Sequence, residues 1–281
     1  MTAMRVNGKS ASRIDLLDRG FQYGDGVFTT LLVQDGVPLF LERHFERLTR
    51  DCQRLAIPPF EWALLRQDVM AVLGDQRQGV IKIQITRGAG GRGYRTPGVV
   101  SPARVVVLHP PSRFPDQYSS AGIEARYCHV RLGINASLAG IKHMNRLEQV
   151  LARSEWQDNG VAEGLMLDHE GLLVEGTMSN VFLVKGRQLQ TPRLDRCGVA
   201  GVMRSIIISA ASTLGLSFSE CRLTPAAVDA ADEVFLTNSI IRLWPIRCLE
   251  GKSYPVGPVT CELRDWLKQT VTDEISRWSR G

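Results

Sequence analysis

Three charged residues in separate parts of the chain have the chemical types that could act together on one ligand. Lys142 lies in the apolar stretch LAGIKHMN, where desolvation would lower the pKa of its amine and let it form a Schiff base with a carbonyl. Glu175 ends a short predicted strand in LLVEGTMSN and could keep a pyridine nitrogen protonated. Arg47 lies beside the apolar stripe of a predicted helix and could hold a phosphate. These residue types indicate an aldehyde, a pyridinium and a phosphate as possible ligands.

Two further segments offer donors to a phosphate. The run GVAGVMR at residues 198–204 leads into a predicted helix, whose first N–H groups lack intrahelical partners and can bind an anion. Thr237, Asn238 and Ser239 end a predicted strand. Each feature alone has an ordinary explanation, such as a solvated lysine, a glycine turn or an arginine paired with a surface glutamate. The combination predicts pyridoxal 5′-phosphate (PLP) as cofactor, because the chain offers a partner for each of its three groups.

Composition places these residues in a globular protein. The chain has 281 residues, 44% hydrophobic and 22% charged, which excludes disordered and fibrous classes and predicts about two domains. No apolar run approaches the roughly 18 residues of a membrane span. The start, MTAMRVNGKS, lacks the apolar core of a secretory signal, so we expect a cytoplasmic protein that does not bind membranes.

Charge and ligand spacing exclude other classes of function. The net charge of +5 is spread along the chain, and only Arg92 and Arg95 lie close together, so no basic stripe predicts nucleic-acid binding. The six cysteines include no C-x-x-C pair, and the five histidines have no metal-ligand spacing. We therefore expect no metal site and unpaired thiols.

The N-terminal part, residues 1–112, reads as a unit of helices and strands. Asp35-Gly36 predicts a hairpin between residues 31–33 and 37–40. Apolar spacing predicts helices over 42–57 and 60–73, the first of them ended by Pro58-Pro59. Strands are expected at 80–86 and 104–108, with the glycine-rich loop GAGGRGYRTPG (88–98) between them.

Residues 113–120 are rich in Pro, Ser and Gln and read as a linker before a larger C-terminal domain, 121–281. There the pattern predicts a helix over 144–156, with Leu147, Val150 and Leu151 facing inward. Further expected elements are strands at 124–130, 164–168, 172–175, 180–184, 188–191 and 233–237 and helices at 202–214, after Thr224-Pro225 and at 259–278. The fold class is therefore predicted as α+β with two domains.

Six stretches resemble, in the same order, those of the fold-type IV PLP enzymes, which include branched-chain aminotransferases, D-amino acid aminotransferases and 4-amino-4-deoxychorismate lyases. The stretches are RGFQYGDGVFTTLL (19–32), LERHFERL (41–48), IKHMNRLEQVLAR (141–153), EGLMLDHEGLLVEGTMSNVFLV (163–184), CGVAGVMR (197–204) and EVFLTNSIIRLWPI (233–246). Because they span nearly the whole chain, the resemblance implies the family's two-domain fold, with PLP in the interdomain cleft, and an active homodimer.

The resemblance also implies roles for single residues. Lys142 matches the Schiff-base lysine, Arg47 the arginine that holds the phosphate, and Glu175 the carboxylate on the pyridine nitrogen.

Further phosphate contacts are implied at two places where the chain departs from its relatives. The main-chain N–H groups of Val202 and Met203 are expected to point at the phosphate, although Met203 replaces a threonine common in the aminotransferases. Asn238 and Ser239 match the remaining contacts, where relatives carry threonine and glycine or serine. Both side chains can still donate a hydrogen bond.

Three details favour the lyases within this family. The loop RGAGGRGYRTPG (87–98) resembles the lyase pattern S-R-G-x-G-G-R-G-Y, and LDRCGVAGVMR (194–204) resembles the same subfamily. Alternation along a strand places Phe28 and Thr30 on one face, where aminotransferases typically carry tyrosine and another residue. We therefore expect both to bind substrate.

The resemblance implies conversion of aminodeoxychorismate to 4-aminobenzoate and pyruvate in folate biosynthesis. The substrate amine would displace Lys142 from the cofactor, and the freed amine would take the C4 proton. Loss of the enolpyruvyl group as pyruvate then makes the ring aromatic. Because the substrate carries two carboxylates, Arg92, with Tyr94 beside it, is expected to bind one of them.

Two other functions stay open. The first is a D-amino acid or branched-chain aminotransferase of the same fold, which would transfer the amino group of a simple amino acid to PLP. The second is a non-enzymatic module whose basic glycine loop binds anions or RNA; bound PLP in the purified protein would exclude it.

Overall fold

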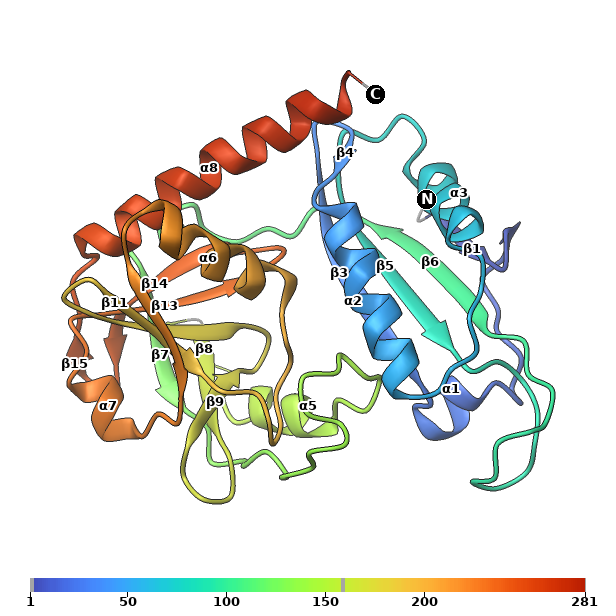
Figure 1. Cartoon of the computed structure of the whole chain (residues 1–281), viewed down its shortest axis with the longest axis horizontal. Coiled ribbons are helices and arrows are strands. Elements are labelled where there is room, and N and C mark those ends of the chain that lie inside the picture. The colour runs from blue at the N-terminus through green and yellow to red at the C-terminus, as the bar shows by residue number, and fades with distance from the viewer. Residues whose placement is uncertain (1–2, 158–159, 281) are drawn as a thin grey trace. The chain divides into compact units, whose positions relative to one another are not determined.

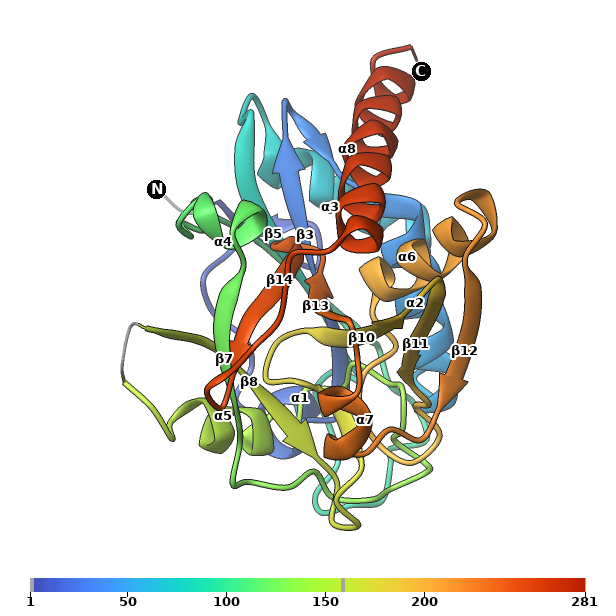
Figure 2. The same ribbon diagram turned by 90° about the vertical axis from the view of Figure 1, so that its left-hand side faces the viewer.

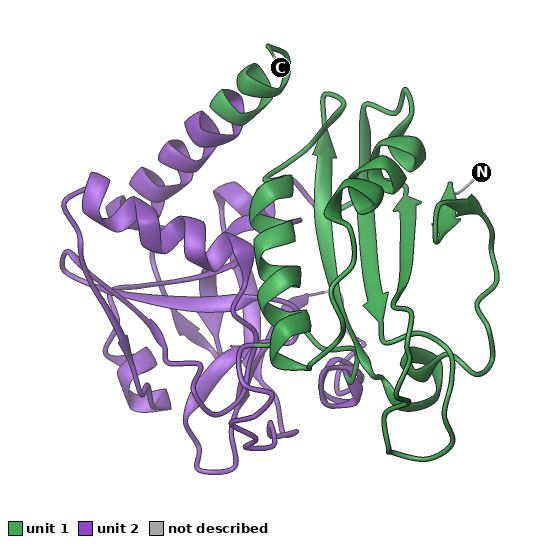
Figure 3. Cartoon of the chain, turned by 45° about the vertical axis from the view of Figure 1, so that its right-hand side comes forward, with its two compact units in different colours: residues 1–113, 141–145, 273–281 green, residues 114–140, 146–272 purple. Residues whose placement is uncertain are grey.

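The computed structural model describes residues 3–157 and 160–280 of the chain. They form two compact units (Figure 3). Unit 1 comprises the described residues of Met1–Arg113, Ile141–Asn145 and Asp273–Gly281, and unit 2 those of Phe114–Gly140 and Arg146–Thr272. The chain thus returns twice to unit 1 after it has entered unit 2. The expected domains, residues 1–112 and 121–281 with a linker at 113–120, remain a proposal.

Unit 1 contains a six-stranded antiparallel sheet with the strand order β2-β1-β6-β5-β3-β4. Its long strands are β3 (Gly26–Gln34), β5 (Gln78–Thr86) and β6 (Ala103–His109). The short strands β2 (Lys9–Ser10) and β4 (Val37–Pro38) form its edges, and β1 (Met4–Val6) lies between β2 and β6. The helices are α1 (Arg19–Tyr23), α2 (Leu41–Arg54) and α3 (Trp62–Leu73). The expected hairpin at Asp35-Gly36 and the two longer helices are confirmed.

Alternation along β3 and β5 determines which face of this sheet is buried. Val27, Leu31, Ile81 and Ile83 are fully buried and pack in one core with the apolar sides of α2 and α3. The α2 helix runs along β3 (Figure 1). The intervening residues of β3, such as Phe28, are only half-buried and lie on the other face.

A short segment far along the chain completes this sheet. Residues 141–145 pair with the start of β3: the Phe28 N–H donates to the Lys142 carbonyl at 3.0 Å, and the Met144 N–H donates to the Gly26 carbonyl at 2.9 Å. Ile141 is fully buried in the core of unit 1. The sequence pattern does not predict this pairing, because it joins residues more than one hundred positions apart.

Unit 2 contains a nine-stranded mixed sheet with the path β12-β11-β10-β13-β14-β7-β8-β9, and β15 pairs with β14. Figure 2 shows β10, β11 and β12 side by side. The strands are β7 (Ile123–Tyr127), β8 (Val161–Leu167), β9 (Leu173–Gly176), β10 (Asn180–Lys185), β11 (Gln188–Pro192), β12 (Ser217–Cys221), β13 (Glu233–Asn238), β14 (Arg242–Leu249) and β15 (Lys252–Ser253). The helices are α4 (Gln117–Ser120), α5 (Leu147–Arg153), α6 (Val202–Thr213), α7 (Pro225–Asp229) and α8 (Pro258–Trp278), whose end belongs to unit 1.

Most predicted elements of this unit are present, and the short helix α7 begins as expected. The Thr224 hydroxyl accepts from the Ala227 N–H at 3.3 Å, and Pro225 occupies the first helical position. Strands β12, β14 and β15 and the short helix α4 were not predicted. In β14 the cause is visible in its sequence, since Pro245 and two arginines interrupt the apolar pattern.

The prediction for α5 was wrong in two respects. The helix spans Leu147–Arg153 rather than 144–156, because the preceding residues pair with β3. Leu147, Val150 and Leu151 do not face inward; their exposed fractions are 76%, 58% and 59%.

No helix in the described part of the chain is long and apolar enough to cross a membrane.

Candidate active site

The main chain of Lys142 is fixed on both sides within unit 1. Its N–H donates to the Asp51 carboxylate on α2 at 3.0 Å, and its carbonyl accepts from the Phe28 N–H on β3. The Asp51 side chain is fully buried, so this hydrogen bond is shielded from water. The Lys142 amine lies over the Phe28 ring, 4.6 Å from the ring centre. The lysine expected to form a Schiff base is therefore held by one helix and one strand.

A second lysine, which the sequence did not indicate, contacts the same ring. The Lys82 amine on β5 lies 5.3 Å from the centre of the Phe28 ring. Cross-strand pairing places Lys82 opposite Thr30, so both share a face of the sheet with Phe28. The two ammonium nitrogens lie within about 10 Å of each other, since each is about 5 Å from one ring centre. The expected pair Phe28 and Thr30 thus lies beside two amines.

Arg47 is buried on the same face of α2 as His44 and Asp51. These residues are spaced three and four positions apart, and their exposed fractions are 6%, 1% and 0%. An Nη2 N–H of Arg47 donates to the Thr29 hydroxyl on β3, and that hydroxyl also contacts His44 Nδ1. Arg47 is therefore held within the unit by Thr29.

The pKa of His44 lies well below its ordinary value of 6.5. Burial is the largest cause, and the positive charges of Arg47 and Lys142 lower the pKa further. His44 is therefore a neutral imidazole at pH 7, which can accept a hydrogen bond at one ring nitrogen.

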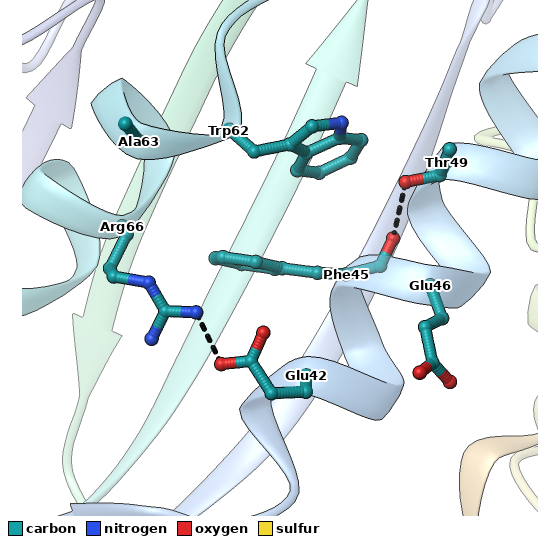
Figure 4. A pocket seen from close by; sticks show the side chains of 7 residues that line it. All are labelled: Glu42, Phe45, Glu46, Thr49, Trp62, Ala63 and Arg66. Carbon is teal, nitrogen blue, oxygen red and sulfur yellow. Dashed lines mark hydrogen bonds and ion pairs between the residues drawn. The ribbon is translucent and has the colours of Figure 1, made fainter. Parts of the chain in front are cut away.

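The opposite side of α2 lines a shallow cavity that contains none of the expected site residues. Figure 4 shows Phe45 and Trp62 in its wall, with Arg66 of α3 paired to Glu42. Its walls belong to the outer surface of α2 and α3. This cavity is therefore not the candidate active site.

In unit 2, the Glu175 carboxylate is positioned at the end of β9. It is 4% exposed, and its Oε2 accepts from the Val199 N–H at 2.8 Å. The neighbouring Gly198 has a φ of +84°, and a Cβ there would lie 2.7 Å from side-chain atoms of Leu194 and Val174. The glycine thus lets the loop before α6 pass close to Glu175. A buried carboxylate held in this way fits a protonated ring nitrogen.

The start of α6 presents main-chain donors. The first helical bond runs from the Ser205 N–H to the Gly201 carbonyl, so the N–H groups of Val202 and Met203 have no partner in the helix. Both residues are buried, at 4% and 2% exposed, and no acceptor for these N–H groups occurs among residues 3–157 and 160–280. Gly201 has no side chain for a physical reason, since a Cβ would lie 2.2 Å from the Asn180 amide oxygen. Buried unpaired N–H groups at a helix start fit a phosphate.

Asn238 is the last residue of β13, and Ser239 lies in the turn before β14. The Asn238 amide oxygen accepts from the N–H groups of Ile240 and Ile241, at 2.8 and 2.9 Å, and its amide nitrogen donates to the Met178 carbonyl at 3.0 Å. Asn238 therefore shapes the turn. The phosphate contacts expected of both residues remain predictions.

Glu163, which the sequence did not indicate, organises the loop between Glu175 and β10. Its buried carboxylate accepts from the N–H groups of Thr177 (3.1 Å) and Met178 (3.2 Å) and from the Ser179 hydroxyl (2.8 Å). Burial raises the pKa of Glu163 above its ordinary value, and these hydrogen bonds oppose the shift. In the sequence it looks like any strand residue, and only the folded loop reveals its role.

The glycine loop is anchored to α1. The Arg19 guanidinium, paired with Asp25 at 2.9 Å, donates to the Gly93 carbonyl at 3.0 Å, and the Gly93 N–H donates to the Tyr23 hydroxyl at 3.2 Å. Arg92 is exposed, and Tyr94 is 88% exposed. Their expected substrate contacts therefore remain predictions, and the anchor residues Arg19 and Tyr23 were missed.

The chain is similar to several known proteins. The chain matches the family described as Amino-transferase class IV over residues 26–249. An aminodeoxychorismate lyase of Vibrio harveyi is 37% identical over 267 residues, which cover 92% of this chain and 97% of that protein. The crystal structure of a 4-amino-4-deoxychorismate lyase from Pseudomonas aeruginosa has a TM-score of 0.91 at 45% identity, covering 95% of this chain and 98% of that one. A D-alanine aminotransferase of Bacillus licheniformis is 25% identical over 279 residues, 97% of each chain.

Two α+β units and a match over most of the length define a class of enzyme: the chain belongs to the class IV aminotransferase family. The expected resemblance to fold-type IV enzymes and the predicted α+β class are thereby confirmed. These two lyases share more identical residues with the chain than the D-alanine aminotransferase does.

Proposed function

We propose that this protein is a PLP-dependent lyase that converts 4-amino-4-deoxychorismate to 4-aminobenzoate and pyruvate. The observation that carries the proposal is the fixed main chain of Lys142 beside Phe28, in a chain that resembles two lyases over nearly its full length. Since 4-aminobenzoate is a folate precursor, we assign the reaction to folate synthesis in the cytoplasm.

Each group of PLP has a partner in the chain. Lys142 would bind the aldehyde carbon, Arg47 and the α6 N–H groups the phosphate, and Glu175 the ring nitrogen. The buried unpaired N–H groups and the buried Glu175 carboxylate support this fit. When bound, PLP supplies an electron-withdrawing ring that acidifies the C–H bond of the carbon bearing the substrate nitrogen.

Lys142 then has a single task, which is to carry a proton. Its neutral amine takes the proton from C4 of the substrate, and the C3–O bond to the enolpyruvyl group breaks as the ring becomes aromatic. The resulting ammonium returns a proton to the methylene carbon of the departing group, which leaves as pyruvate. One residue thus serves as base and acid, and no external proton donor is needed.

The substrate carboxylates need cationic partners, and unit 1 offers two. Arg92 on the glycine loop is the partner expected from the sequence. Lys82 is supported by geometry, because it shares the Phe28 ring with Lys142. The ring carboxylate lies para to the substrate amine, so a second cation across a ring-sized gap from Lys142 suits it. We propose Lys82 for the ring carboxylate and Arg92 for the enolpyruvyl carboxylate.

An aminotransferase is the second candidate function, because D-alanine and branched-chain aminotransferases are among the relatives. It would convert PLP to its amine form with a simple amino acid and without aminodeoxychorismate. A panel of D- and L-amino acids, followed by the absorbance of bound PLP, tests this half-reaction. A lyase should show little of it.

We also propose a homodimer. One side of α5 is apolar and exposed to water, and it is formed by Leu147, Val150 and Leu151. Exposed apolar surface of this kind is unfavourable in a monomer and suits a contact with a second copy of the chain. Sedimentation of the PLP-loaded protein at micromolar concentration tests it, and a monomer would contradict it.

The lyase proposal is tested by adding aminodeoxychorismate to the PLP-loaded protein without any keto acid. Equal amounts of 4-aminobenzoate and pyruvate over many turnovers are expected. A PLP-loaded protein that releases neither product would overturn the proposal and leave the aminotransferase as the leading candidate.

A further inference from the structure

Two buried polar residues of unit 1, Thr29 and His44, have no part in the chemistry described so far. We propose that they are positioning residues, which hold the Arg47 guanidinium in the orientation that binds the phosphate of PLP. The inference rests on the proposed role of Arg47 as a phosphate ligand.

Thr29 interrupts an otherwise apolar face. Alternation along β3 places its side chain between Val27 and Leu31, both fully buried, and Thr29 itself is 0% exposed. A hydroxyl at such a position is costly unless it is hydrogen-bonded, and a valine would fill the same space without that cost. The hydroxyl therefore has a reason to be there other than packing.

Both partners of this hydroxyl lie on α2. An Nη2 N–H of Arg47 donates to Thr29 Oγ1, and His44 Nδ1 lies within hydrogen-bond distance of the same oxygen. His44 is 1% exposed and Arg47 6% exposed. The three side chains form a continuous network from the strand to the helix, with the guanidinium at one end.

The direction of the hydrogen bonds follows from the chemistry of the groups. A guanidinium only donates, so the Thr29 oxygen accepts from Arg47 and its own hydrogen is available to His44. A neutral imidazole accepts that hydrogen at Nδ1 and carries its proton at Nε2. Burial and the positive charges of Arg47 and Lys142 favour this neutral form. Since the hydroxyl also donates, it becomes a better acceptor for the guanidinium.

Fixing Arg47 in advance strengthens phosphate binding. A free arginine side chain loses rotamer freedom when it is immobilised by a ligand, and a side chain that is already held does not lose it again. The network therefore contributes to affinity for the phosphate group specifically. It would contribute nothing to a bond between Lys142 and the aldehyde.

This difference provides the test. Pyridoxal carries the aldehyde and ring of PLP but no phosphate, so the ratio of the two dissociation constants isolates the phosphate contribution. Thr29→Val removes the hydroxyl at nearly constant volume, and Thr29→Ser is the matched control that keeps it. Binding of each compound is followed by the absorbance that appears when it attaches to the purified chain.

We expect Thr29→Val to weaken PLP binding about tenfold and to leave pyridoxal binding within twofold of wild type. Thr29→Ser should stay within about threefold for both compounds. If Thr29→Val weakens both compounds equally, or neither, the network is only structural and the inference is wrong.

A second pair of variants keeps the test decisive if Thr29→Val does not fold. His44→Asn retains an acceptor near the position of Nδ1, whereas His44→Leu removes it. Only the leucine variant should lose affinity for PLP relative to pyridoxal. Equal loss in both variants would contradict the inference.

The inference and the proposed function can fail separately. A wild-type protein that prefers PLP to pyridoxal but releases no 4-aminobenzoate disproves the lyase and leaves the network intact. A wild-type protein that binds pyridoxal as tightly as PLP disproves phosphate binding by Arg47, and the inference fails with it.

Discussion

In unit 1 the expected phosphate ligand is a side chain, the Arg47 guanidinium, whereas in unit 2 it is the main chain at the start of α6. The side chain needs supporting polar residues, and Thr29 and His44 are buried beside it. The main-chain N–H groups are already fixed by the helix. They require only that residue 201 be a glycine, because a Cβ there would lie too close to Asn180. The orientation of a long arginine side chain therefore depends on the polar residues around it. The orientation of the N–H groups at a helix start depends on the helix itself and on space for the loop before it.

The largest expected effect comes from removing the side-chain ligand. Arg47→Ala should weaken PLP binding by about 2.7 kcal/mol, which is about a hundredfold, because a charge-assisted contact is lost. Pyridoxal binding should change little. The measurement is the dissociation constant of each compound, with Arg43→Ala, an exposed arginine of the same helix, as the control. Similar losses for both compounds would show that Arg47 stabilises the fold rather than the phosphate.

The matching change in unit 2 is Gly201→Ala. A Cβ at this position would lie 2.2 Å from the Asn180 amide oxygen. Either the Asn180 side chain turns away and loses its hydrogen bond to the Val199 carbonyl, or the loop shifts; both changes disturb the start of α6. We expect the free energy of unfolding to fall by about 2 kcal/mol and PLP affinity to fall about tenfold. Gly98→Ala is the control, because a Cβ there meets nothing within 4 Å. Equal behaviour of the two variants would contradict the assigned role of Gly201.

The two residues proposed to bind the substrate carboxylates also differ in how they are held. Lys82 lies on a central strand, whereas Arg92 lies on an exposed loop. Lys82→Met should raise KM for aminodeoxychorismate about tenfold, about 1.4 kcal/mol, with unchanged PLP affinity, and Lys82→Arg should stay close to wild type. A KM that responds to Arg92→Met and not to Lys82→Met would reverse the assignment.

The smallest effect is a difference in the pH dependence of stability. The pKa of His44 in unit 1 is lowered, so below pH 6.5 the unfolded chain binds a proton that the folded chain does not. His44 therefore makes the free energy of unfolding fall as pH decreases, by at most about 1.4 kcal/mol per pH unit. Urea unfolding between pH 7 and 5.5 should show a shallower fall for His44→Asn. An unchanged slope would mean that His44 is charged in the folded protein.

Glu163 in unit 2 should change the free energy of unfolding with pH in the opposite direction. Its pKa is raised by burial, so the folded chain keeps a proton above pH 4.5 that the unfolded chain loses. The free energy of unfolding therefore falls as pH rises above 4.5, and Glu163→Gln should remove this contribution. Urea unfolding of both proteins from pH 4 to 6 measures it, and parallel curves would contradict it.

The sequence predicted the parts of this molecule that depend on local pattern. The helix with Arg47 and the strand that carries Glu175 follow from apolar spacing, and the helix start at Val202 follows from the glycines before it. Lys142 was found through its apolar neighbours, although its pairing with β3 was not.

The residues that were missed act through distant partners. Thr29 resembles any strand threonine until α2 brings His44 and Arg47 against it, and Lys82 becomes notable only through the Phe28 ring. The leucines of α5 were misjudged for a related reason. Their spacing is amphipathic, but the spacing cannot show whether the apolar side meets the same chain or another molecule.

The central claim is that Lys142 is the lysine that binds PLP. Lys82 is the obvious competitor, because its amine contacts the same Phe28 ring. The direct measurement is reduction of the PLP-loaded protein with borohydride, followed by digestion and mass spectrometry of the modified peptides. Our account predicts the pyridoxyl group on Lys142 alone, with Lys82 unmodified. Modification of Lys82, or of any lysine other than Lys142, would contradict it.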